Sequence, residues 1–172
     1  NVISNTQFSV DFGPITLASG APQTVYASYP VIRTQAVQTT KNVKKARYVK
    51  INCNTGGTGG PWNLGLTDVY KISAVYVGTT YNVNNTDRTN WFTLDTGQTE
   101  SQYNHAKLVI KPQFAGQISS STRILVELNY FEANTAAGVG FFSVDSYPVR
   151  GPGVAANSTN ISYAEIPIFQ GQ

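Results

Sequence analysis

Apolar and polar residues alternate along most of this chain, and a period of two is the spacing of a half-buried β-strand. In RILVELNYFE (residues 123–132), Ile124, Val126 and Leu128 share one face, and the other face carries Glu127. Similar short stretches, rich in β-branched and aromatic residues, are 24–29, 46–52, 69–77, 91–95, 107–111 and 141–147. Because no long helical spacing separates them, these stretches predict antiparallel pairing. We therefore expect an all-β fold, an antiparallel β-sandwich of immunoglobulin-like or jelly-roll-like type.

Turn-rich stretches predict how the chain is organised. We expect N-terminal strands that form a contact arm at 1–45, the sandwich core at 46–150, and a C-terminal linker with a docking strand at 151–172. In TESQYNHA, Thr99 followed by Gln102 fits a capping box, which predicts one short helical turn near 99–105.

Composition limits the class of protein. The chain has 172 residues, of which 41% are hydrophobic and 12% charged, enough for one domain with a large core. Its one cysteine cannot form an internal disulfide, which suits folding in a reducing cytoplasm. No apolar run approaches the roughly 20 residues of a membrane helix, so we expect no membrane span. Because the chain contains no methionine, we also expect a piece of a longer polypeptide.

Five of the twelve basic residues fall in one short segment: Lys41, Lys44, Lys45, Arg47 and Lys50. A nucleic-acid site needs several aromatic stacking partners beside such a basic patch, and this segment offers Tyr48 alone. We therefore expect no nucleic-acid partner. The interpretation we favour is an edge strand that its lysines protect from pairing with other chains.

The most tempting chemistry lies in LDTGQTESQYNHA, residues 94–106. Its Asp95-Thr96-Gly97 triplet superficially resembles the aspartic-protease signature, but the triplet occurs once and the downstream bracing motif is missing. Between two strands, Asp-x-Gly more often forms a turn, because aspartate accepts backbone hydrogen bonds and glycine tolerates positive φ. The only histidine, His105, has no obvious nucleophile to activate. We expect no enzymatic activity.

Metal and cofactor sites are not predicted either. A zinc site needs three or four His or Cys ligands, and the chain has one of each. The aspartates are scattered and form no calcium-binding loop. Aromatic side chains could instead line a carbohydrate groove, and the candidates that face a ligand are Trp62, beside a glycine-rich loop, and Trp91, at a strand start.

Three stretches, DRTNWFTLDTGQTESQYNHAKLVIKP (87–112), ILVELNYFEANTAAGVGFFSVDSYP (124–148) and YAEIPIF (163–169), together resemble a module of large virion proteins of tailed bacteriophages. The segment at 60–78 also looks like the lead into that module. The matching positions are Asp95, Gly97, Gln98, Tyr103, Lys111, Pro112, Tyr130, Phe131, Phe142, Ser143, Val144, Asp145, Ser146, Tyr147, Ile166 and Pro167. Relatives usually carry Arg-Asp where this chain has Thr99-Glu100.

The resemblance implies a structural part of the tail, baseplate or fibre-attachment region, without known catalytic residues or cofactors. Its partners would be other virion proteins and copies of itself, within a virion assembled in the host cytoplasm. On this interpretation Asp95, Gly97, Gln98 and Tyr103 shape a structural turn, in which Gln98 bonds to unpaired backbone. The alternative function is a receptor-binding or carbohydrate-binding domain of a phage tail or fibre that recognises a host surface glycan.

Overall fold

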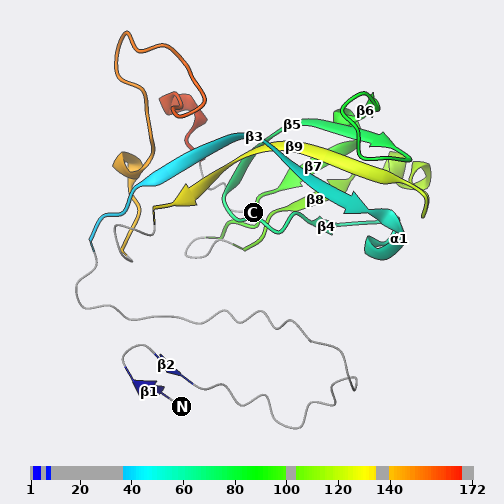
Figure 1. The fold of residues 1–172 in the computed structure, drawn as a ribbon, viewed down its shortest axis with the longest axis horizontal. Helices are drawn as coiled ribbons and strands as arrows, with labels where there is room; N and C mark the ends of the chain where they lie inside the picture. Colours follow the sequence, from blue (N-terminus) through cyan, green and yellow to red (C-terminus); the bar gives the residue numbers. More distant parts are fainter. Residues whose placement is uncertain (1, 5–6, 9–36, 100–103, 135–139, 168–172) are drawn as a thin grey trace. The chain divides into compact units, whose positions relative to one another are not determined.

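The computed structural model describes residues 2–4, 7–8, 37–99, 104–134 and 140–167 (Figure 1). The chain divides into two compact units, Asn1–Arg33 and Thr34–Gln172. The described part of the first unit is an antiparallel pair, β1 (Val2–Ser4) and β2 (Gln7–Phe8). The strand predicted at 24–29 lies outside the described residues.

The larger sheet of the second unit has four antiparallel strands in the order β3-β9-β5-β6. These are β3 (Lys41–Asn52), β9 (Arg123–Ala133), β5 (Val69–Gly78) and β6 (Thr86–Asp87). The order places β3 at one edge of the sheet, and β3 runs without a break across the boundary predicted after residue 45. The predicted domain boundaries otherwise stay predictions.

The smaller sheet has three antiparallel strands in the order β4-β8-β7. These are β4 (Trp62–Asn63), β8 (Lys107–Ile110) and β7 (Phe92–Asp95). Figure 1 shows them on one side of the long strands β3, β9 and β5. Val126 and Leu128 of the larger sheet share one buried cluster with Leu108 and Ile110 of the smaller sheet. The predicted all-β, antiparallel fold is confirmed, whereas its immunoglobulin-like or jelly-roll-like type stays a prediction.

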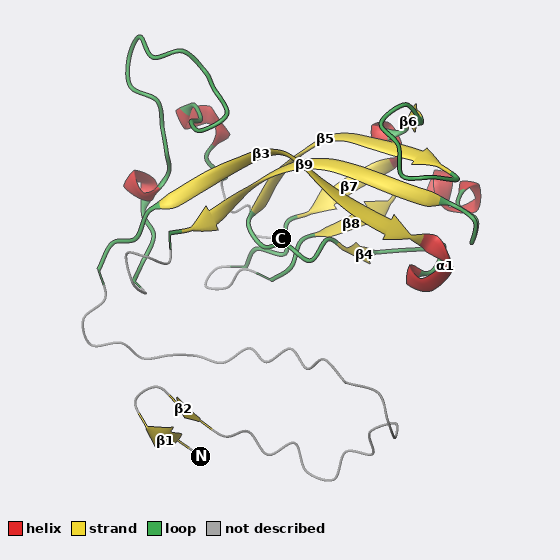
Figure 2. Cartoon of the chain, viewed as in Figure 1, coloured by secondary structure: helices red, strands yellow, loops and turns green. Residues whose placement is uncertain are grey.

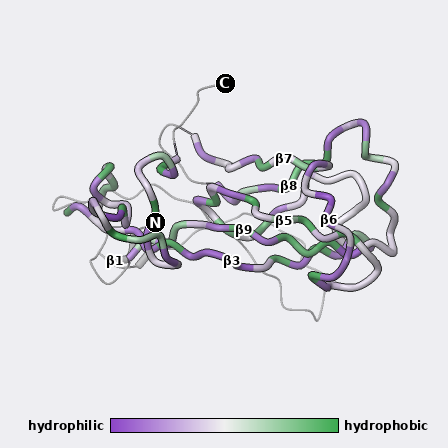
Figure 3. Tube along the Cα trace, turned by 90° about the horizontal axis from the view of Figure 1, so that it is seen from above, coloured by the Kyte–Doolittle hydropathy of each residue, from purple (hydrophilic) through white to green (hydrophobic). Residues whose placement is uncertain are grey.

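Burial on both faces suits β9 to an inner position in the larger sheet. Ile124, Val126 and Leu128 are fully buried on the face that meets the smaller sheet, and burial of each such side chain stabilises the fold by about 1.5–3 kcal/mol. Leu125 and Phe131 on the opposite face are buried as well. Seen from above, hydrophobic stretches follow β5 and β9, whereas much of β3 is hydrophilic (Figure 3).

Short helices occupy several connections in the described residues (Figure 2). They are α1 (Cys53–Gly56), η1 (Thr89–Trp91), η2 (Pro112–Gln117), η4 (Val144–Ser146) and η5 (Tyr163–Glu165). The helical turn predicted near 99–105 falls mostly on undescribed residues 100–103.

The strand predicted at 141–147 is wrong. Phe141 forms an isolated bridge with Gln38, and η4 follows. Ser143 accepts a bond from the Asp145 N–H, and its own N–H donates to the Ser146 hydroxyl, so side-chain bonds replace strand pairing. The docking strand predicted after residue 151 is wrong for the described part of that segment, where Ile161 only bridges Val149 and η5 follows.

A β-bulge interrupts the pairing of the edge strand β3 with its neighbour β9. The register with β9 shifts between Lys44 and Arg47, and Ala46 adopts a φ of 51°. The Ala46 N–H has left the strand ladder and donates instead to Oδ1 of the buried Asn129, at 3.0 Å. The bulge therefore depends on one amide side chain from the neighbouring strand.

We predict that Asn129→Ala will destabilise the domain by about 1–3 kcal/mol, because the Ala46 N–H loses its partner. Ala46→Gly should not destabilise it, since glycine tolerates positive φ. Urea unfolding followed by circular dichroism measures both variants. Equal stability of wild type and Asn129→Ala would contradict this account of the bulge.

Candidate functional site

The Asp95-Thr96-Gly97 triplet forms a tight turn after β7. The Gly97 N–H donates to Asp95 Oδ1 at 2.9 Å, and the Gln98 N–H reaches the Thr96 hydroxyl at 3.4 Å. Gly97 has a φ of 66°, and a Cβ there would lie 2.7 Å from the His105 carbonyl oxygen. Asp95 therefore bonds within its own turn. Tyr103 lies outside the described residues, and the backbone-bonding role of Gln98 stays a prediction.

The other chemical candidates lie apart from this turn or are occupied. Nδ1 of His105 lies 3.3 Å from the Asn63 side-chain amide. Burial raises the pKa of the Cys53 thiol, which opposes formation of a reactive thiolate. The described ranges contain no group of three or more His, Cys, Asp or Glu residues that could hold a metal ion.

Neither tryptophan is placed as a ligand-facing platform, which corrects the prediction for Trp62 and Trp91. Trp62 is 3% exposed, donates from Nε1 to the Gly57 carbonyl at 2.8 Å, and packs edge-on against Phe92. Trp91 stacks on Phe114 with ring centroids 5.3 Å apart. The Arg88 guanidinium lies 4.7 Å from the same indole, so side chains of the domain already contact this partly exposed ring.

The tyrosines Tyr48 and Tyr163 are exposed, whereas neither tryptophan is. Tyr48 of β3 is exposed and donates to Oε2 of Glu127 on β9 at 3.2 Å. Desolvation and the nearby Glu127 carboxylate raise the pKa of both Tyr48 and Tyr76. Tyr81 lies under the Lys50 ammonium, at 5.5 Å. The exposure of Tyr48 could have been predicted from the sequence, because Tyr48 alternates with Val49. Val49 packs against the buried cluster between the two sheets, which we call the main core.

The five basic residues of the predicted patch do not act as one surface. Lys44 pairs with Glu132 at 3.1 Å. Lys45 donates to the carbonyls of Asn157 and Asn160, at 3.0 and 2.7 Å. Arg47 and Lys50 are exposed on β3. The fifth, Lys41, corrects the patch prediction most strongly, because its side chain is only 2% exposed.

Lys41 links three segments that are distant in sequence. Its Nζ lies 2.6 Å from Oδ2 of Asp68, just before β5, and 3.1 Å from the Tyr147 hydroxyl. The same ammonium lies 4.6 Å from the ring centroids of Phe142 and Tyr147. Asp68 also accepts a bond from the Phe131 N–H through its carbonyl, at 3.0 Å. The first residue of β3 is thus tied to the start of β5, to β9 and to the C-terminal segment.

Electrostatics keep this ammonium charged. Burial alone would lower the pKa of Lys41, but the hydrogen bond and charge of Asp68, together with Tyr147, outweigh it and raise the pKa. Burial raises the pKa of the Asp68 carboxyl, and Lys41 offsets only part of this rise. A lysine whose pKa is raised is not an amine nucleophile at neutral pH, so the geometry gives Lys41 an anchoring role.

A second, smaller core lies beside Lys41. Val43, Phe131 and Ile161 are its buried members, and the partly buried side chains packed on them are Tyr70, Tyr147, Val149 and Ile166. Phe131 stacks on Tyr70 at 4.5 Å and meets Tyr147 edge-on at 4.9 Å. We call this group the satellite core. It joins the end of β9 to the segment 140–167.

Segment 140–167 presents much of the exposed apolar surface. Five of the eight large hydrophobic side chains that are exposed in the described ranges belong to it: Phe141, Phe142, Val144, Val154 and Tyr163. The segment is nevertheless fixed, through buried Ser146 and Ile161, through the bond of Lys41 to the Tyr147 hydroxyl, and through the bonds of Lys45 to Asn157 and Asn160. It is loop with two short helical turns (Figure 2).

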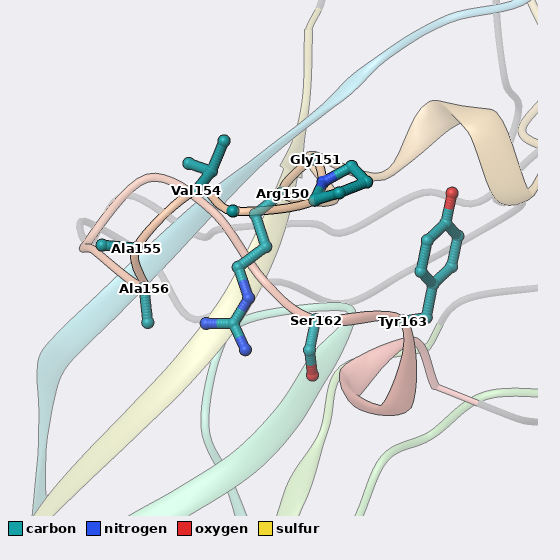
Figure 4. Close-up of a pocket in the computed structure, with 9 residues that line it drawn as sticks. Arg150, Gly151, Val154, Ala155, Ala156, Ser162 and Tyr163 are labelled. Carbon is teal, nitrogen blue, oxygen red and sulfur yellow. The ribbon is translucent and has the colours of Figure 1, made fainter.

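An open pocket of about 550 Å³ lies within this segment. Arg150 extends across it toward Ser162 and Ala156, and the Tyr163 ring stands at its other side (Figure 4). The Ser162 hydroxyl donates to Glu165 at 3.3 Å, whereas none of the described side chains bonds to the Arg150 guanidinium. An arginine beside an exposed aromatic ring suits an acidic ligand with an apolar face.

Comparison with models of known protein families, with curated proteins and with solved structures finds no match to this chain. Within the described ranges, every helix is too short or too polar to cross a membrane.

We predict that Lys41→Met will destabilise the domain by about 3–5 kcal/mol, because it leaves the Asp68 carboxylate buried without its cation. Lys41→Met/Asp68→Asn should recover much of that loss, since the double variant buries no charge. Urea unfolding of wild type and both variants measures the difference. A double variant no more stable than Lys41→Met would contradict the pairing.

The Lys41→Met defect should depend on pH. Burial raises the pKa of Asp68, and no lysine offsets this rise in the variant. A carboxyl whose folded pKa exceeds its unfolded pKa stabilises the fold below the unfolded value and loses this contribution as pH rises through the folded value. The loss of melting temperature relative to wild type should therefore be larger at about pH 7 than at about pH 4. The double variant, which lacks the carboxyl, should not show this trend.

We predict that Gly97→Ala will destabilise the domain more than Gly65→Ala. Gly65 has a φ of 68° but nothing near its Cβ position, whereas a Cβ at Gly97 would collide with backbone. Positive φ alone costs about 1–2 kcal/mol for alanine, and the collision adds to it. Equal losses in urea unfolding would show that the close approach of Gly97 to His105 has no energetic role.

Proposed function

We propose that this chain is a structural assembly domain of a tailed-phage virion, in the tail, baseplate or fibre-attachment region. It acts through contacts with copies of itself and with other virion proteins, and it joins the particle in the host cytoplasm. Its mechanism is geometric: a packed all-β core holds a preorganised surface against which partners dock.

The observation that carries the proposal is the combination of anchoring and exposure in segment 140–167. Exposed large apolar side chains gain free energy when a partner covers them. Here they project from a backbone that Lys41, Lys45 and the satellite core already hold in place. A partner therefore orders little of this segment on binding, which favours affinity.

The resemblance to tailed-phage virion modules supports the same proposal. Several of its matching positions pack together: Phe131, Tyr147 and Ile166 belong to the satellite core, and Ser143 and Ser146 shape η4 beside it. This part of the shared pattern therefore corresponds to residues that fix the segment.

The second candidate function is recognition of a host surface glycan, and the pocket of Arg150 and Tyr163 favours it. The exposed Tyr163 ring could stack on a sugar face, and Arg150 could bind an acidic substituent. This site replaces Trp62, which is buried, and Trp91, whose ring already contacts Phe114 and Arg88. Saturable binding of an acidic oligosaccharide, lost in Arg150→Ala, would support it.

We predict that a phage carrying Val144→Ser/Tyr163→Ser in this domain will assemble poorly, because both side chains lie on the proposed docking surface. They are 57% and 72% exposed, so the isolated domain should keep its melting temperature. Val83→Ser changes an exposed valine outside segment 140–167 and serves as the matched control. The measurement is electron microscopy of purified particles labelled with antibodies against the domain.

The expected result is one fixed labelled position on wild-type and Val83→Ser particles, and reduced labelling or incomplete particles for the double variant. Wild-type particles without label, or normal assembly of the double variant, would contradict the proposal.

A further inference from the structure

The main core is open along one seam of the domain. A groove of about 560 Å³ runs between the edge strand β3 and the loop that follows β4. Val49 of β3, Leu66 of the loop and Tyr130 of β9 line it. All three side chains are half-buried: one side of each packs against the main core, and the other side lines the groove. The seam thus offers an apolar floor in continuity with the core.

The wall of this groove is a strand edge. Between Arg47 and Asn52, β3 pairs with β9 on one side, and the strand order ends at β3 on the other. In the described ranges no further strand pairs with this stretch. Backbone N–H and C=O groups on such an edge are available to an added strand, and alternate side chains of that strand would point into the groove.

Charge selects which strand can add there. The sequence of β3, KNVKKARYVKIN, has five basic residues and no acidic one. Lys41, Lys44 and Lys45 are engaged within the domain, which leaves two exposed cations on this part of β3: Arg47 at the groove, and Lys50 on the opposite face of the strand, above the Tyr81 ring. No acidic residue lines the groove. A second copy of β3 would set like charges against one another and is disfavoured.

We propose that the seam between β3 and the loop after β4 binds an extended acidic segment of a partner protein, which adds to the sheet beside β3. Its apolar side chains share one face of the added strand and cover Val49, Leu66 and Tyr130 in the groove. Its acidic side chains lie on the other face, toward Lys50, and Arg47 at the groove attracts the negative charge of the segment as a whole. This inference rests on the proposed assembly function and assigns one contact of that function to a definite surface and a partner chemistry. Arg47 and Lys50 then discriminate among strands by charge.

The probe is a fluorescein-labelled peptide of about ten residues in which Glu and Val alternate, so that all the glutamates fall on one face of a strand. Fluorescence anisotropy with the intact chain measures its affinity at low salt. A Lys-Val peptide of the same length tests charge, and a Glu-Val peptide with every second amide N-methylated tests backbone pairing. Amide shift changes in NMR spectra of the labelled chain locate the contact.

We expect the Glu-Val peptide to bind at least about tenfold more tightly than the Lys-Val and N-methylated peptides. Amide shifts should change at Arg47–Lys50 and Leu64–Leu66. Arg47→Glu should weaken binding by about tenfold, whereas Lys71→Glu, the same charge change on exposed β5 surface, should not.

Equal binding of the N-methylated peptide, or shift changes away from β3, would overturn the proposal. If a single-stranded oligonucleotide binds more strongly and displaces the peptide, the surface beside β3 binds nucleic acid, and this result would also overturn the proposal. Self-association seen in sedimentation, with concentration-dependent amide shifts confined to β3, would show that a second copy is the occupant, against our argument.

The two proposals fail separately. Absence of peptide binding together with normal labelling of wild-type particles would reject the docked strand and keep the assembly function. Particles that never contain the domain would reject the assembly function, whatever the peptide does.

Discussion

The buried ion pair between Lys41 and Asp68 is the interaction on which the rest of the structure depends. A charge that is buried away from water must be compensated by an opposite charge or by hydrogen bonds. Here the ammonium of Lys41, at the start of β3, is compensated by Asp68, just before β5, and by the hydroxyl of Tyr147. One ammonium thereby fixes a segment that lacks strand pairing of its own. The same ammonium bonds the hydroxyl of Tyr147, whose ring packs edge-on against Phe131 in the satellite core.

This arrangement separates two tasks within one domain. The main core between the sheets is apolar and supplies stability, because Ile124, Val126 and Leu128 alternate toward it with no polar interruption. The satellite core is mixed, and it converts an irregular segment into a surface with fixed geometry. Interaction surfaces need both properties, since a stable core limits distortion and a preorganised surface limits the entropy lost on binding.

Much of the fold could be predicted from the sequence, because a period of two reports burial on one face directly in β8 and at Ile124, Val126 and Leu128 of β9. The same rule was wrong for 141–147, where local serine bonds to backbone competed with strand pairing. It also could not show that Lys41 is buried, since that depends on Asp68, 27 residues away, and on Tyr147, 106 residues away. The tryptophans were misplaced for a related reason: composition identifies an aromatic side chain, whereas only packing decides whether its face is covered.

Hydrogen–deuterium exchange of wild type and Lys41→Met tests most directly whether this lysine anchors the C-terminal surface. The account predicts that amides of Phe141, Tyr147, Val149 and Ile161 exchange faster in the variant under conditions where it remains folded, whereas the amides of β8 keep their protection. Unchanged exchange in segment 140–167, or a uniform increase throughout both sheets, would contradict the claim that one buried charge holds this surface in place.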